Sequence, residues 1–405
     1  MRKRKTPLTL LAAILLLTLL PGCGTAPAPT QEQPAPTEAP TQEPTQKPTQ
    51  APTQGSTAAP APTAPPETKP TVTTQSGTKG MADGPAGGSW KIGSLGIAWK
   101  TYQYAGQEVC RRYYYYIPSS YQKGEPLPLM ISLPGSGTSA SFQMNEGKWK
   151  DLAEREGFVL LAPEYVCLHA DRQLSAQGYT QYQIGQDSSS NMRWVATGAE
   201  PVAAHGIDDV AYLTDLMDLF IEEGFVDEHR VFASGLSHGA YMAQRLAIEI
   251  PERLAGVGLV ASGIYFTFGS NVLTNKVRIV YIQGTQDPIV PYDGIWAGAQ
   301  CVSYSLPKSI DWFLSRYGVT AEPVVTELPD TDPSDGCTIT RSEYRNDDGT
   351  PQLIAYVVNG GGHTWPGGTQ YLVEGWIGKL CKDAQASELI WNDLKDATNI
   401  GTQLP

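Results

Sequence analysis

The sequence VFASGLSHGAYMAQRLAI, residues 231–248, decides the predicted fold. An apolar run of β-forming residues enters the segment Gly235-Leu236-Ser237-His238-Gly239, and apolar side chains at helical spacing follow it. We interpret this as a strand, a sharp turn and a helix, with Ser237 at the apex as candidate nucleophile. The glycines let neighbouring backbone approach closely, and the helix start leaves N–H groups unpaired beside the serine oxygen. Alone, the pattern also fits a glycine-rich turn with an ordinary serine.

The first 84 residues are predicted to lie outside the folded domain, which we place at 85–405. Four basic residues, an apolar stretch at 8–20 and the sequence Leu20-Pro21-Gly22-Cys23 resemble a bacterial lipoprotein signal peptide, 1–22, with Cys23 lipidated. The alternative is an ordinary secretory signal with an incidental cysteine. Residues 23–84 are rich in Pro, Thr and Gln and are predicted to be a disordered linker. We therefore expect an extracellular lipoprotein, attached to the membrane only through its N-terminal anchor.

Charge and cysteine content limit the partners and the chemistry. The formal net charge of −12 argues against binding to nucleic acid or to anionic membrane surfaces. The sequence contains no CxxC or HExxH spacing, so no metal site is expected. An exported protein can form disulfides, but an odd number remains beside Cys23, so at least one thiol stays free or pairs between chains. These are Cys110, Cys167, Cys301, Cys337 and Cys381.

Apolar runs alternate with helical patterns along the rest of the chain, which predicts an α/β fold with a mostly parallel sheet covered on both faces. The region 165–205 is long and polar and contains Trp194, and we expect it to line a substrate cleft. Asp208 is a candidate cap for the helix that follows it. Strands are expected at 111–117, 127–133, 158–162, 256–261, 277–283 and 353–358, and helices at 148–156, 208–221, 309–316 and 384–397.

Two side chains that follow predicted strands could complete a catalytic triad with Ser237. His363 lies in a glycine-rich loop after the strand that ends at 358, where a general base could reach solvent. Asp287 follows the strand 277–283 and is the candidate acid, with Asp293 as the second choice. The alternative for Asp287 is a turn aspartate before proline. The order serine, acid, histidine agrees with the elbow interpretation.

The segment Pro134-Gly135-Ser136-Gly137 directly follows the predicted strand 127–133. In a fold with a serine elbow, this position supplies a backbone N–H for a developing oxyanion. Proline has no N–H, so the Ser136 amide is the first candidate and that of Gly135 the second. An ordinary glycine turn remains the alternative.

At this point the chain resembles the polyhydroxybutyrate depolymerase and feruloyl esterase group of the α/β-hydrolases. The resemblance rests on RRYYYYIPSSY, GLSHGAYMA, GTQDPIVPY and GGGHTWPGG and covers about residues 110–370. It implies ester hydrolysis without metal or organic cofactor, by Ser237, Asp287 and His363. The His238 and Ser136 amides would be the oxyanion donors. Relatives usually carry His-Gly where this chain has Pro134-Gly135, and no separate polymer-binding domain is visible.

The expected substrates are feruloyl or acetyl esters of plant polysaccharide, with hydroxyalkanoate polyester as the alternative. A serine peptidase and a non-catalytic surface-binding lipoprotein are weaker alternatives. Trp365 and Trp194 are candidate substrate-binding residues, and simple packing is the other interpretation of Trp365.

Overall fold

The computed structural model describes residues 83–104, 107–168, 180–182, 191–197, 200, 203 and 206–404. They belong to the second of two units, Val72–Pro405; the first unit, Met1–Thr71, lies outside the described residues. The predicted signal peptide, Cys23 and nearly all of the linker therefore also lie outside them. None of the helices in the described part is long and apolar enough to cross a membrane.

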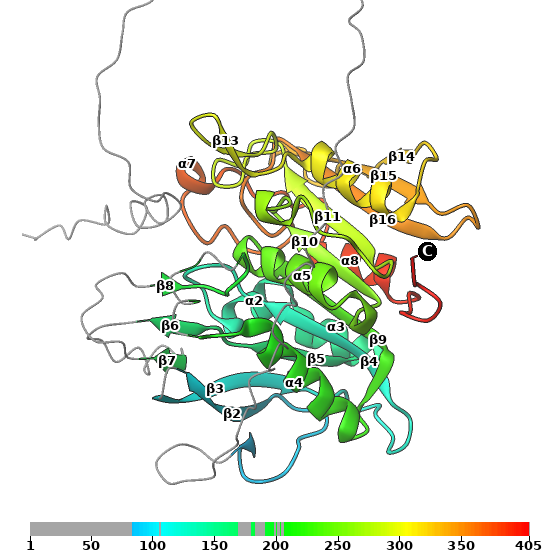
Figure 1. Cartoon of the computed structure of the whole chain (residues 1–405). Coiled ribbons are helices and arrows are strands. Elements are labelled where there is room, and N and C mark those ends of the chain that lie inside the picture. Colours follow the sequence, from blue (N-terminus) through cyan, green and yellow to red (C-terminus); the bar gives the residue numbers. More distant parts are fainter. Residues whose placement is uncertain are drawn as a thin grey trace, which may run out of the picture. The chain divides into compact units, whose positions relative to one another are not determined.

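One twisted sheet of eleven strands organises the described residues (Figure 1). Its order is β1-β2-β3-β5-β4-β9-β10-β11-β16-β15-β14, and the six strands from β5 to β16 run parallel. Parallel strands buried on both faces need continuous apolar sequence, which β4, β10 and β11 have. The strands are β1 (Gly84–Pro85), β2 (Gly96–Tyr104), β3 (Gln107–Tyr116), β4 (Leu127–Leu133), β5 (Val159–Pro163), β9 (Val226–Leu236), β10 (Gly256–Val260), β11 (Arg278–Gly284), β14 (Val324–Glu327), β15 (Thr338–Arg345) and β16 (Pro351–Asn359).

Helices cover both faces of this sheet (Figure 1). On one face, α4 (Asp209–Glu222), α5 (His238–Glu249) and α6 (Leu306–Tyr317) pack into one apolar core. On the other, α2 (Ala140–Glu146), α3 (Trp149–Glu156) and α8 (Ala386–Leu394) pack into a second core. This order of parallel strands, in which α5 begins directly after the turn that follows β9, is that of the α/β-hydrolases. The predicted fold class is confirmed.

Local signals account for where several of these helices begin and end. The Asp208 side chain accepts the N–H of Ala211 at 3.1 Å and caps α4, as predicted. Gly157 ends α3 with φ of 78°, a left-handed conformation that glycine adopts without strain. The Ser305 hydroxyl accepts the N–H of Lys308 and caps α6.

Shorter elements connect these layers. Residues 165–205 contain a small sheet of β6 (Val166–Leu168), β7 (Thr180–Tyr182) and β8 (Asn191–Met192), but most of this region lies outside the described residues. That it lines a substrate cleft stays a prediction. The remaining short elements are η3 (Pro251–Arg253), η4 (Phe266–Phe268), a hairpin of β12 (Ile295–Ala297) and β13 (Gln300–Ser303), and α7 (Glu374–Ile377).

Candidate active site

Ser237 lies in the sharp turn between β9 and α5 that its flanking glycines predicted. Its φ of 56° is a left-handed conformation that costs a non-glycine residue about 1–3 kcal/mol. The Ser237 N–H donates to the carbonyl of Val260 at 2.8 Å, which fixes the turn to β10. A Cβ on Gly239 would lie 2.2 Å from the Leu133 oxygen, and one on Gly235 would lie 2.4 Å from the backbone of Gly239. Both glycines are therefore required for the strand and the helix to approach so closely.

The loop after β4 lies against this turn. A Cβ on Gly135 would be 3.0 Å from the Leu236 oxygen and 3.6 Å from the Cβ of Ser237. Ser136 follows, half-buried, and its backbone N–H has no hydrogen-bond partner among the described residues. The N–H of His238, the first residue of α5, also lacks an intrahelical partner by helix geometry. The two predicted oxyanion donors thus flank Ser237, and their role stays a prediction.

Trp194 supports this loop, and its side chain is not exposed to contact a substrate, which corrects our expectation. Its side chain is fully buried, and its indole N–H donates to the carbonyl of Pro134 at 3.0 Å. The ring also packs edge-on against Tyr165. The indole N–H is thus used to hold Pro134, the first residue of the loop after β4.

The predicted acid and base form a buried pair. The Nδ1 atom of His363 lies 2.8 Å from Oδ2 of Asp287, and both residues are less than 5 % exposed. The other oxygen of Asp287, Oδ1, accepts the N–H groups of Ile289 and Val290, each at 2.8 Å. Because Nδ1 is engaged, Nε2 is the ring nitrogen left for proton transfer. The second choice of acid, Asp293, is exposed and makes no such contact among the described residues.

The loops after β11 and β16 pack against each other, which brings Asp287 and His363 into contact. A Cβ on Gly284 would lie 2.4 Å from the oxygen of Gly361, and Gln286 N–H donates to that oxygen at 2.9 Å. Since β9, β10, β11 and β16 are parallel neighbours, Ser237 and this pair follow strands at the same edge of the sheet. No hydrogen bond joins the Ser237 hydroxyl to the His363 ring within the described residues. Such bonds are often long in ligand-free structures and tighten only in the substrate complex.

Of the two interpretations of Trp365, substrate contact and simple packing, the structure supports packing, because the side chain is fully buried. It packs edge-on against Trp149 of α3, with ring centroids 6.1 Å apart, in the core that α2, α3 and α8 cover. Trp365 therefore anchors the histidine loop and is not a substrate contact in this structure.

Glu200 is a site residue that sequence reasoning missed. The buried ring of His238 places Nε2 3.2 Å from Oε1 of Glu200 and 3.0 Å from the carbonyl of Trp194. Burial opposes ionisation of Glu200, but the contact with His238 and a hydrogen bond from the Thr197 hydroxyl outweigh it and lower its pKa. These contacts tie Trp194 and Glu200 to the first turn of α5. The one signal in the sequence was His238, directly after the serine. No pattern linked this histidine to Glu200, which is distant in the chain.

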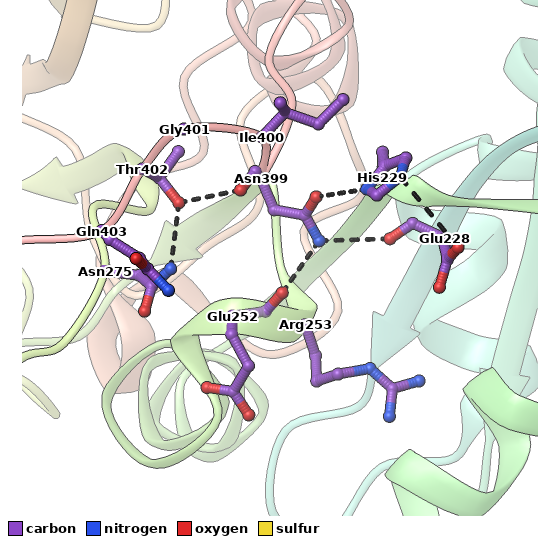
Figure 2. A pocket seen from close by; sticks show the side chains of 10 residues that line it. All are labelled: Glu228, His229, Glu252, Arg253, Asn275, Asn399, Ile400, Gly401, Thr402 and Gln403. Atoms are coloured by element: carbon purple, nitrogen blue, oxygen red, sulfur yellow. Dashed lines mark hydrogen bonds and ion pairs between the residues drawn. The ribbon is translucent and has the colours of Figure 1, made fainter.

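A hollow of about 570 Å³ lies at the opposite edge of the sheet (Figure 2). It is formed near the amino ends of β9, β10 and β11 by polar residues that include His229, whose Nδ1 lies 2.9 Å from Oδ1 of Asn399. Ser237, Asp287 and His363 all follow the carboxyl ends of their strands. The hollow is therefore separate from the candidate active site. Two further histidines, His169 and His205, lie outside the described residues.

Comparisons with known proteins give partial matches, and no family model matches the chain. NocK of Nocardia uniformis subsp. tsuyamanensis, assigned as an esterase, is 30% identical over 171 residues, 40% of this chain and 49% of that protein. The bifunctional acetylxylan esterase/xylanase XynS20E of Neocallimastix patriciarum is 23% identical over 197 residues, 49% of this chain and 24% of that protein. Poly(3-hydroxyalkanoate) depolymerase C of Paucimonas lemoignei is 22% identical over 256 residues, 59% of this chain and 55% of that protein.

Two weaker matches are of the same kind. A protein of Aspergillus niger assigned as feruloyl esterase C is 27% identical over 104 residues, 26% of this chain and 35% of that protein. The solved structure of an acetyl xylan esterase from Aspergillus awamori aligns over 63% of this chain and 89% of its own, at 15% identity and a TM-score of 0.39. The chain spans about half or less of the length of the curated relatives it matches. Its homologues are thus proteins named as esterases, acetylxylan and feruloyl esterases and polyhydroxyalkanoate depolymerases, and the predicted resemblance to this group is confirmed.

Proposed function

We propose that the chain is a serine hydrolase of carboxylic esters that works through an acyl-enzyme. The observation that carries this is the 2.8 Å contact between His363 and Asp287, at the sheet edge where the strained Ser237 turn lies. A buried carboxylate that orients a histidine, beside a serine with unpaired backbone N–H groups, is suited to acyl transfer.

The chemistry assigns one task to each group. The Nε2 atom of His363 takes the proton of the Ser237 hydroxyl as its oxygen attacks the ester carbonyl. The N–H groups of His238 and Ser136 hold the oxyanion, each contributing about 3 kcal/mol by comparison with other hydrolases. His363 then protonates the leaving alcohol, and water repeats the steps on the acyl-enzyme. Asp287 keeps the imidazole in the tautomer that these transfers need and stabilises its charged form.

We propose feruloyl or acetyl esters of plant polysaccharide as substrates. The relatives named as acetylxylan and feruloyl esterases support this. A second candidate is hydroxyalkanoate polyester, because the match to the Paucimonas lemoignei depolymerase spans the larger share of this chain, 59%.

An assay panel on the purified full chain tests these alternatives. It contains methyl ferulate, acetylated xylan, short hydroxybutyrate oligomers and a peptide amide. We expect turnover of at least one ester and none of the amide. Preference for the oligomers would select the polyester hydrolase, whereas turnover of the amide alone, or of no substrate, would contradict the proposed function.

We also propose that the protein is held at the cell surface by a lipid on Cys23, which the sequence Leu20-Pro21-Gly22-Cys23 supports. Replacing Cys23 with serine is expected to move most of the protein from the membrane fraction to the medium, because only the anchor retains it. Immunoblots of the two fractions measure this, with Cys301→Ser as the control. Unchanged membrane association of the Cys23 variant would contradict the anchor.

A further inference from the structure

Two cysteine side chains lie together at the active-site edge of the sheet. Cys337 directly precedes β15, and Cys381 follows α7. Their sulfur atoms and a carboxylate oxygen of Asp335 all lie within 4.8 Å of one another. Both cysteines are almost fully buried, at 2 % and 0 % exposed. A disulfide needs the sulfurs at about 2.05 Å, so the side chains must approach by at most about 3 Å.

Carboxylates hold the two backbone segments in place around this pair. Asp335 accepts the N–H of Cys337 on Oδ1 and the N–H of Lys382 on Oδ2, each at 2.7 Å. Asp383 in turn accepts the N–H of Thr331 at 2.7 Å. The segments that carry the two cysteines are thus aligned by hydrogen bonds that do not depend on the sulfurs.

The same two segments flank the loop that carries His363. Next to Cys337, Thr338 pairs with Asn359 at the end of β16, where the loop begins. Further along, His363 N–H donates to the carbonyl of Ile377 at 2.5 Å, and Gly367 N–H donates to that of Cys381 itself at 2.9 Å. A covalent link between the cysteines would therefore join the two strips of backbone that support the histidine loop from either side.

We propose that Cys337 and Cys381 form a disulfide. It would join the two backbone segments that support the loop of the catalytic His363. The oxidant is a disulfide compound such as oxidised glutathione or a thiol–disulfide oxidoreductase. While the chain folds, before these side chains are buried, a thiolate of one cysteine attacks the donor disulfide, and the second cysteine then displaces the donor thiol from the mixed disulfide. One S–S bond forms in the protein and one breaks in the donor. Two electrons reduce the donor to two thiols, which take up the two protons that the cysteines lose.

A metal ion fits the same atoms less well. Both oxygens of Asp335 already accept backbone N–H groups. Burial, together with nearby aspartates, raises the pKa of the Cys337 thiol to about 11 and that of Cys381 to about 12. Metal ligation needs thiolates, which this environment opposes, whereas a disulfide carries no charge.

Peptide mapping of the full chain tests the link. The protein is unfolded, refolded with oxidised glutathione, alkylated in denaturant, digested without reduction and analysed by mass spectrometry. We expect the peptides of Cys337 and Cys381 to be joined, at two hydrogen masses below their sum, and to separate after dithiothreitol. Alkylation of both thiols after oxidation would overturn the proposal, as would a stoichiometric bound zinc ion that protects them.

Thermal unfolding gives a second readout that needs no variant. The link closes a loop of about 45 residues, so dithiothreitol is expected to lower the Tm of the oxidised protein by about 5–10 °C. The double variant Cys337→Ser/Cys381→Ser should show no response to reductant, and the control Cys301→Ser should keep the full shift. A Tm of the oxidised wild type that does not change with reductant would contradict the proposal.

Discussion

Alanine in place of Ser237 is expected to lower the rate of ester hydrolysis about 10⁶-fold, the loss seen when the nucleophilic serine is removed from a serine protease. The loss follows because no other hydroxyl lies in the turn between β9 and α5. Alanine has the same Cβ as serine, so the φ of 56° is no more strained and the fold should persist. Steady-state kinetics on the best ester of the panel, with a far-UV spectrum of the variant, measures both effects.

Ser234→Ala is the matched control. Ser234 lies three residues upstream on β9, is fully buried, and its hydroxyl has no hydrogen-bond partner within the described residues. Removing that hydroxyl should leave both fold and turnover nearly unchanged. Retention of activity in the Ser237 variant would refute the assignment of Ser237 as the nucleophile. An equal loss in both variants would instead point to damage to the elbow.

The central sheet was predictable because its signals are local. A strand buried on both faces must be apolar throughout, so 127–133 coincides with β4 and 256–261 nearly coincides with β10. The outer strand β2 was not predicted. Its sequence GIAWKTYQY mixes charged and aromatic residues, and it is stabilised by its antiparallel pairing with β3. A pairing of that kind is a property of two segments and leaves no pattern in one of them.

The same distinction applies to the site. Asp287 and His363 could be identified because each follows a strand in the order that the elbow requires, and the structure places them in contact. The choice between packing and substrate contact for Trp365 could not be made from sequence, because its burial depends on Trp149, a residue far away in the chain. Glu200 was missed for the same reason, since its contact with His238 of α5 exists only in the folded chain.

The Asp287→Asn variant should lose about 10³- to 10⁴-fold in kcat while remaining folded. The N–H groups of Ile289 and Val290 both donate to Oδ1 of Asp287, so an asparagine must present its carbonyl oxygen to them. Its amide NH₂ group then faces Nδ1 of His363, which lies 2.8 Å from the present Oδ2. That contact requires Nδ1 to accept, and the ring proton moves to Nε2. A histidine protonated there cannot take the proton of Ser237, as in a serine protease with the same substitution.

Asp293→Asn is the matched control, because it changes the same group in the same loop at an exposed position. It should keep kcat within about twofold of the wild type, as expected for a change remote from a buried pair. If kcat falls in Asp287→Asn but not in Asp293→Asn, and KM is similar in both, the loss comes from the orientation of the histidine and not from damage to the loop. Equal activity of Asp287→Asn and the wild type would mean that the carboxylate does not set the tautomer. If only the Asp293 variant lost activity, Asp293 would be the acid of the triad. The loop after β11 would then have to rearrange during catalysis.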